Sequence, residues 1–361
     1  MIITSSIALI TYDLRLVKVF FYTLKEMQYF LIFFVVANWI RSEKDCKLAT
    51  SFLLFAGLLN AIWVAFQLGT STKRQLFLVE RSFISPDQQA RLMESYGPNL
   101  VGESSPLATG GFFLLVLLLT MSFYLFYRSG NRKWPYVVLG VLFSVSLILS
   151  FSRVAILGAV IGIVILIFSN TNLKIIIKTI PIFIIILVLT AWMMDQFEYL
   201  PGDLRLSYSD VIRSIIERWQ TIWLPLLHGQ NVGSLFLGLG KGALGSLKGL
   251  EASEAHNHYL RVFIESGLFG LTAFIGLLMS VIFLSAKVFK GSKLPICKVI
   301  GGTTLAATAG LSVGALFQDI FMPVLLNELW WILIGLTAAA YRIEYKLLSL
   351  PSQARWNYFN K

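Results

Sequence analysis

The stretch EASEAHNHYLRVFIESGLFGLTAFIGLLMSVIFLSA, residues 251–286, passes directly from a polar segment into an apolar one. The apolar part, 260–285, is long enough to cross a roughly 30 Å hydrocarbon layer, which takes about 20 helical residues. The polar part holds carboxylates and two histidines, His256 and His258. Histidine exchanges protons near neutral pH because its ordinary pKa is roughly 6.5. The stretch therefore predicts an active site at the mouth of a membrane-spanning helix.

The rest of the chain has the composition of a membrane protein. Its 361 residues are 57% hydrophobic and 14% charged, with a mean hydropathy of +0.75, whereas soluble domains carry about 25% charged residues. Segments that cross lipid must be helical, because hydrocarbon satisfies no open backbone group. We expect an all-α polytopic membrane protein with about nine transmembrane helices. The apolar runs are 27–40, 48–69, 107–127, 135–151, 154–168, 179–194, 259–286, 299–317 and 326–341.

The basic residues predict the orientation. The net charge is +11, and its lysines and arginines gather in short connections, which suits a topology signal better than nucleic-acid binding. The connections that carry them are 41–47, 128–133, 170–178, 287–298 and the tail from 342, and the bias of such residues toward the cytoplasm places all five there. Cys46 and Cys297 lie in these connections, so no structural disulfide is expected.

The opposite, external face then receives the polar loops. Three regions follow: helices with an external loop at 70–106 in residues 1–194, a long external loop with short helices at 195–258, and helices with a basic tail at 259–361. Ahead of the first span, residues 13–26 place charges among apolar residues at helical spacing, which predicts an interfacial helix. Residues 1–12 have no signal-peptide pattern, and we expect the chain to begin partway into a larger architecture.

Several arginines are candidates for anion binding on the external face. Arg153 stands between two apolar runs, where an arginine at mid-bilayer costs about 2.5–3.5 kcal/mol. It either snorkels to the interface or meets an anionic headgroup, whose oxygens a guanidinium binds in pairs. Arg205, Arg213 and Arg218 lie in the long loop, each on a solvated face or at a phosphate. Arg218 is favoured because Trp219 beside it suits the membrane interface.

The glycine-rich and histidine-rich segments offer less specific signals. LGLGKG, 237–242, has backbone N–H groups that suit phosphate but matches no nucleotide motif, so a simple turn over the site is favoured. His256 and His258 share a face only in an extended segment, and without cysteines or an aspartate pair nearby we expect no metal. The neighbours Glu254 and Asn257 favour chemistry at His256 over a structural role.

Taken in order, these motifs resemble those of a known family. Arg218-Trp219, LGLGKG at 237–242, HNHYL at 256–260 and ESGLFGL at 265–271 are similar to the signature of the bacterial O-antigen ligase and O-antigen polymerase superfamily. The Ser152-Arg153 junction resembles another of its marks. In topology the resemblance covers roughly 13–345.

The resemblance implies a metal-independent glycosyltransferase of the bacterial cytoplasmic (inner) membrane, with its active site on the periplasmic face and no cofactor. It would take a glycan from an undecaprenyl-diphosphate carrier and pass it to a sugar hydroxyl. His256 falls on the catalytic histidine, and Arg153 and Arg218 on the phosphate-binding arginines. Arg213 is a further phosphate candidate, with Asn257, Glu254, Tyr259 and Arg205 as secondary site residues. Arg15, Lys18 and Lys25 are extra phosphate contacts to test, since the family has further spans before this region.

Three functions remain open at this point. A polymerase joins lipid-linked repeat units to one another, and we favour it. A ligase moves the finished glycan onto lipid A-core. A transporter or flippase of lipid-linked sugar is the rival from another class; such proteins commonly place ionisable residues within their spans and show internal repeats. Here the ionisable residues gather at one face, which favours an enzyme.

Overall fold

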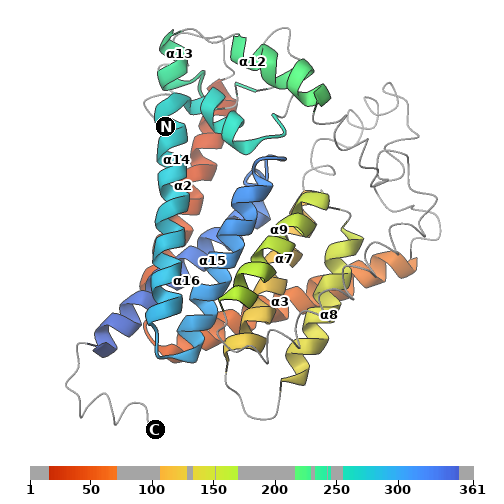
Figure 1. Ribbon diagram of the computed structural model, residues 1–361, viewed down its shortest axis with the longest axis vertical. Helices are drawn as coiled ribbons and strands as arrows, with labels where there is room; N and C mark the ends of the chain where they lie inside the picture. The colour runs from red at the N-terminus through yellow and green to blue at the C-terminus, as the bar shows by residue number, and fades with distance from the viewer. Residues whose placement is uncertain are drawn as a thin grey trace.

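Helices are the only regular elements among the described residues of the structure, a computed structural model (Figure 1). It describes residues 16–70, 106–127, 133–150, 152–169, 216–228, 232–241, 243–244 and 255–348. The larger helices are α2 (Leu16–Trp39), α3 (Glu43–Thr70), α7 (Pro106–Phe126), α8 (Trp134–Leu149), α9 (Arg153–Phe168), α14 (His258–Gly291), α15 (Pro295–Gly314) and α16 (Val324–Leu348). A π-helix, η2 (Trp219–Trp223), leads into α12 (Leu224–His228), and α13 (Val232–Leu237) follows.

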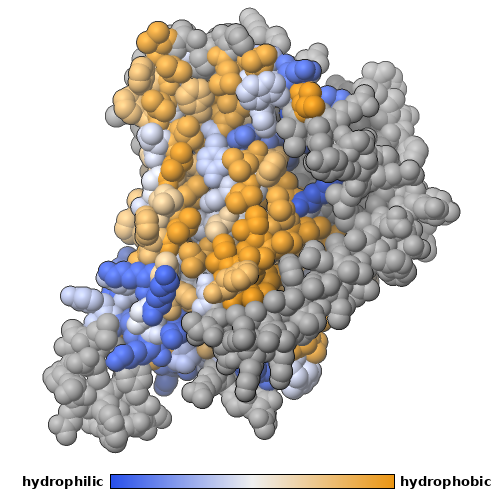
Figure 2. All heavy atoms as spheres, viewed as in Figure 1, coloured by the Kyte–Doolittle hydropathy of each residue, from blue (hydrophilic) through white to orange (hydrophobic). Residues whose placement is uncertain are grey.

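The prediction of an all-helical, multi-pass membrane protein is confirmed for this part of the chain. Five described helices are long and apolar enough to cross a membrane: α3, α7, α14, α15 and α16. Two shorter apolar helices, α8 and α9, accompany them. Figure 2 shows apolar side chains over the middle of the helices and hydrophilic ones gathered at the lower end.

The predicted spans match described helices closely except at the start of the chain. Residues 13–26 were expected to form an interfacial helix that feeds the first span, 27–40, and α2 runs through both segments as one continuous helix of 24 residues, Leu16–Trp39. Two of the charges in its first half have partners within the fold. Lys25 Nζ donates to the carbonyl of Met322 at 3.0 Å, and Glu26 pairs with Lys241 at 3.2 Å. The expected span 179–194 and the loop 70–106 lie outside the described residues.

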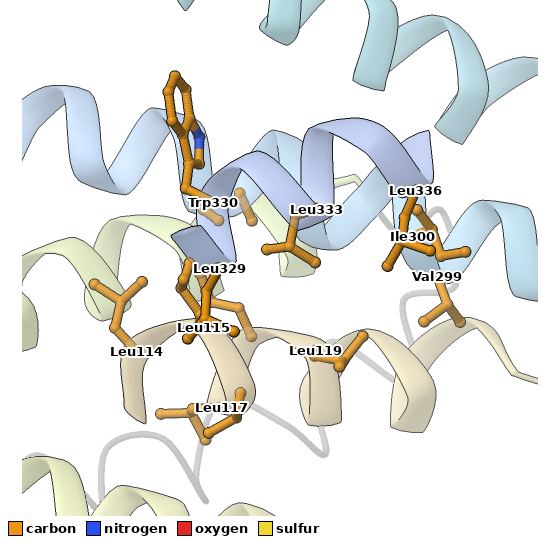
Figure 3. Packing of buried hydrophobic residues seen from close by; sticks show 14 of the residues in the cluster. Leu114, Leu115, Leu117, Leu119, Val299, Ile300, Leu329, Trp330, Leu333 and Leu336 are labelled. Atoms are coloured by element: carbon orange, nitrogen blue, oxygen red, sulfur yellow. The ribbon is translucent and has the colours of Figure 1, made fainter. Parts of the chain in front are cut away.

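The centre of the bundle is α7. Its residues from Phe112 to Leu119 are all buried, as expected of a helix that is apolar on every side. Figure 3 shows Leu115 and Leu119 directed toward Leu329 and Leu333 of α16, with Val299 and Ile300 of α15 nearer to Leu336. α7 also packs against α8 and α9. It therefore holds α8, α9, α15 and α16 together at the centre of the bundle.

Glycines let α9 approach α15 closely. A methyl group on Gly158 would lie 3.2 Å from the carbonyl oxygen of Gly310, and one on Gly162 would lie 3.1 Å from that of Ala306. Small residues four apart on facing helices allow such backbone contact in membranes. One turn further, a methyl on Gly314 would lie 3.0 Å from Val154 Cγ1. The first turn of α9 therefore lies beside the last turn of α15.

Hydrogen bonds join segments that are distant in sequence at one end of the bundle. Arg342 Nη2 donates to the carbonyls of Ala37 (2.7 Å) and Ile40 (2.8 Å). The amide of Lys293 donates to Glu344 Oε1 at 2.8 Å. We call this the basic end. Cys46 and Cys297 are both free and fully buried. The opposite end carries the start of α9, the start of α14 and the α15–α16 connection, residues 315–323, and we call it the site end.

Candidate functional site

His256 lies at the site end in an unusual backbone conformation. Its φ is +49°, and it is the one described non-glycine residue with positive φ. That region is uncommon for non-glycine residues, although histidine enters it more readily than most. Its ring Nδ1 lies 3.2 Å from Gln318 Oε1 in the α15–α16 connection, and the ring is partly exposed. Outliers of this kind gather at functional sites, where the surrounding structure holds them in place.

The residues on either side fix His256. The amide of Ala255 donates to Asp319 Oδ2 at 3.2 Å. Asn257 caps α14, and its Oδ1 accepts from the amide of Leu260 at 3.0 Å, as an N-cap asparagine does. The amide of His258 donates to the carbonyl of Ala315 at 2.8 Å. Two of these three bonds tie the start of α14 to the α15–α16 connection.

Arg218 reaches the same connection from the other direction. It directly precedes η2, and its Nη1 donates to the carbonyl of Phe317 at 3.1 Å. Trp223, at the end of η2, donates its indole N–H to the carbonyl of Ala255 at 2.7 Å. Arg218 and His256 therefore contact adjacent residues, Phe317 and Gln318. Trp219 is half exposed.

Arg153 begins α9 on the remaining side of this connection. Ser152 is the N-cap, and its Oγ accepts from the amide of Ala155 at 3.4 Å. The next residue, Val154, contacts Gly314 at the end of α15, and Gly314 also faces Ile320. Arg153 thus sits at a helix N-terminus, which favours anions, next to the connection that Arg218 and His256 contact.

Behind His256 lies a buried cluster of ion pairs. Arg261 Nη1 contacts Asp319 Oδ2 at 3.1 Å, and Arg261 Nε contacts Glu265 Oε1 at 3.2 Å. Glu265 Oε2 in turn contacts Lys241 Nζ at 3.1 Å, and Lys241 also contacts Glu26 Oε1 at 3.2 Å. The four side chains other than that of Glu26 are at least nine-tenths buried. This ion-pair cluster joins α2, the glycine-rich loop, α14 and the α15–α16 connection.

The carboxylates determine the charge state of Lys241. Burial by itself would lower the pKa of its amine, but the attraction of Glu265 and then of Glu26 outweighs burial. The net result is a pKa above the ordinary lysine value. Lys241 therefore remains protonated as a member of the ion-pair cluster.

The glycine-rich loop is joined to α14 by its own backbone. α14 has a kink at Gly267, with φ +64° and ψ −166°, just after Ile264 and Glu265. The amides of Leu239 (2.8 Å) and Gly240 (3.0 Å) donate to the carbonyls of these two residues. These two loop N–H groups are therefore already hydrogen-bonded to the helix. They do not point to a phosphate, as the alternative reading of 237–242 would require.

The second histidine is in a different environment. His258 is 5% exposed, and its ring contacts those of Phe274 and Phe321, with 5.2 Å between centroids in each pair. Tyr259, a secondary candidate, donates its hydroxyl to the carbonyl of Ser312 at 2.8 Å. Asn257 is the helix cap described above. All three are built into the fold around His256.

Of the remaining predicted residues, Lys25 also reaches the α15–α16 connection, because its Nζ donates to the carbonyl of Met322 at 3.0 Å. Lys18 belongs to α2. Arg15, Arg205, Arg213 and Glu254 lie outside the described residues. Sequence reasoning did not single out Arg261, Gln318 and Asp319. The spacing of Arg261 and Glu265 by four residues in an apolar span was a usable signal, since such charges in a membrane helix are almost always paired.

The described residues hold no group of three or more His, Cys, Asp or Glu side chains arranged to bind a metal ion. The sequence matches none of the protein-family models and none of the curated proteins with which it was compared.

Proposed function

We propose that this protein is a membrane glycosyltransferase that extends a surface polysaccharide from an undecaprenyl-diphosphate-linked donor. The observation that carries the proposal is the convergence at the α15–α16 connection. His256 contacts Gln318 at 3.2 Å, and Arg218 contacts Phe317 at 3.1 Å. A proton acceptor and a guanidinium beside it are the two groups that transfer from a phosphate leaving group requires.

The depth of the site in the bundle supports a lipid-linked substrate. α15 has 20 residues, and at about 1.5 Å per residue it is about 30 Å long, which is the thickness of the hydrocarbon layer. Lys293 lies just before its first turn, and the amide of His258 binds the carbonyl of Ala315 just after its last. In the proposed orientation the basic end faces the cytoplasm, nine helices span the inner membrane, and His256 lies at the level of the periplasmic headgroups, where a lipid diphosphate is held.

The proposed reaction is a direct displacement. Neutral His256 accepts the proton of the acceptor hydroxyl while that oxygen forms a bond to the anomeric carbon. The bond from this carbon to the diphosphate oxygen breaks, and its electron pair leaves with the lipid diphosphate. Arg218 and Arg153 stabilise the charge that develops there, usually the largest contribution to catalysis. The base contributes about 10²- to 10⁴-fold, and with a lipid diphosphate as leaving group no nucleotide is needed.

The experiment uses full-length protein in lipid nanodiscs with purified lipid-linked repeat units. A ladder of product lengths is expected from repeat units alone. If product forms only when lipid A-core is added, the protein is a ligase instead. Movement of labelled lipid across the bilayer without any covalent change would overturn the transferase proposal in favour of a flippase.

Matched variants test the proposed roles. His256→Asn is preferred to alanine, because asparagine adopts positive φ readily and the backbone stays in place. We expect it to lower the rate by about 10²- to 10⁴-fold with unchanged thermal stability. Arg218→Lys keeps the charge but loses the paired contact with phosphate. We therefore expect it to lower the rate less than His256→Asn does. Gln220→Ala changes an exposed residue of η2 and should leave the rate unaltered. Full activity of His256→Asn refutes the base assignment.

A further inference from the structure

The contact between His256 and Gln318 carries information about the proton on the imidazole. A neutral imidazole has one N–H donor and one acceptor nitrogen, and the partner of each decides which is which. Here the atom that faces Nδ1 is Gln318 Oε1, at 3.2 Å. An amide oxygen only accepts hydrogen bonds. With the amide assigned in this orientation, the hydrogen bond places the proton on Nδ1 and leaves the lone pair on Nε2.

The backbone on both sides of this contact is fixed. The amide of Gln318 donates to the carbonyl of Gly314 at 3.1 Å, and its own carbonyl accepts from the amide of Ile320 at 2.8 Å. Arg218 holds the carbonyl of Phe317. Ala255 is bound to Asp319. The side chain of Gln318 is thus presented to His256 from a connection with few ways to move, as an orienting group requires.

We propose that Gln318 is a positioning residue that selects the Nδ1–H tautomer of His256. Nε2 is then the atom that accepts the proton of the acceptor hydroxyl. The kinetic part of this inference rests on the proposed function, whereas the tautomer itself does not. In this role Gln318 contacts the imidazole, so its effect on rate passes through His256.

Two near-isosteric variants separate the possible roles of Gln318. Gln318→Glu keeps an acceptor toward Nδ1 and removes the donor. Gln318→Leu removes both. The charged groups from the elements around this connection are the same in both variants: Arg218, Arg153 of α9, Arg261 and Glu265 of α14, Lys25 and Glu26 of α2, Lys241 of the glycine-rich loop, and Asp319. Differences between the two therefore report the group at position 318.

The first measurement is spectroscopic. The chain has three histidines, so ¹⁵N-histidine labelling in nanodiscs gives few signals, and His256→Asn assigns the one of interest. Above the pKa of the ring, we expect Nδ1 protonated and Nε2 unprotonated in the wild type and in Gln318→Glu. In Gln318→Leu we expect a mixture of the two tautomers. A wild-type signal with the proton on Nε2 overturns the proposal.

The second measurement is the rate of transfer against pH. We expect Gln318→Leu to lower kcat by about ten- to a hundred-fold, within the contribution of the base itself, with KM little changed. We expect Gln318→Glu to retain activity and to move the acidic limb of the profile to higher pH, because a carboxylate favours the charged imidazolium. Equal profiles for all three proteins overturn the positioning role. If the wild-type protein carries the proton on Nδ1 but shows no transferase activity, the proposed function is refuted and the tautomer inference stands.

Discussion

Replacement of Gly267 by alanine tests how the glycine-rich loop and α14 are joined. Gly267 has φ +64° and ψ −166°, a combination that is essentially confined to glycine. An added methyl group would overlap the carbonyl of Phe236 and would lie 2.6 Å from the backbone nitrogen of Gly238. These are main-chain atoms with no rotamer to change. The loop and the helix must therefore separate to admit the methyl group.

The magnitude follows from what separation removes. Strain at such a backbone position costs about 1–3 kcal/mol. The bonds from Leu239 to Ile264 and from Gly240 to Glu265 are the contacts at risk, and each contributes about 0.5–1.5 kcal/mol net. Together Gly267→Ala should lower the free energy of unfolding by about 2–6 kcal/mol.

Gly276→Ala is the matched control on the same helix. Nothing lies within 4 Å of a methyl group added there, and alanine favours a helix over glycine by about 1 kcal/mol. Thermal unfolding of both variants in the same nanodiscs, followed by tryptophan fluorescence, makes the comparison. We expect a clearly lower midpoint for Gly267→Ala and an unchanged or higher one for Gly276→Ala. Equal midpoints would refute the backbone contact.

Three further predictions concern stability. Glu265→Gln removes the carboxylate between Lys241 and Arg261 and should cost about 3–5 kcal/mol in chemical unfolding, whereas Glu43→Gln, which breaks the outer pair with Lys47, should cost about 0.5 kcal/mol or less; equal losses would contradict the burial of the ion-pair cluster. Because the pKa of Lys241 is raised on folding, its stabilisation is present below the ordinary lysine value of about 10.4 and is lost as pH rises through the folded value. Stability should thus fall more steeply as pH rises above about 10 in the wild type than in Lys241→Met, and parallel curves would argue against a protonated Lys241. Gly310→Ala presses a methyl against the backbone of α9 and should lower the unfolding midpoint by the equivalent of about 1–3 kcal/mol, while Gly140→Ala, with 3.9 Å to its nearest neighbour, should not.

The described membrane helices were predictable from hydropathy because a segment that crosses lipid must be helical and apolar over about 20 residues. Their arrangement was not. A helix that is apolar on all sides is expected at the centre of a bundle. Several runs in this sequence have that property, so the sequence does not single out α7 as the central helix. The approach of α9 to α15 had a signal in Gly158, Gly162, Gly310 and Gly314, pairs of glycines four residues apart. The same residues do not say which helix pairs with which.

The candidate site was predictable in part. A titratable histidine before a span and an arginine before a tryptophan pointed to His256 and Arg218. Their neighbours did not stand out, because Gln318 and Asp319 lie in a short connection between two spans and no local pattern reveals its fold. The glycine-rich loop was expected to form a simple turn. Instead the loop binds α14 beside the kink at Gly267. This contact joins residues that are about 25 positions apart in the chain, and no local spacing predicts it.

The ion-pair cluster bears on which arginines the proposed function assigns to the diphosphate. Among the described residues, its ion pairs join two cations, Lys241 and Arg261, to three carboxylates, those of Glu26, Glu265 and Asp319. Both cations are thus already paired, and a diphosphate placed against the cluster would meet these carboxylates. The cluster therefore holds four segments of the chain together. For this reason the proposal assigns the charge that binds the diphosphate to Arg218 and Arg153, on the elements beside the α15–α16 connection.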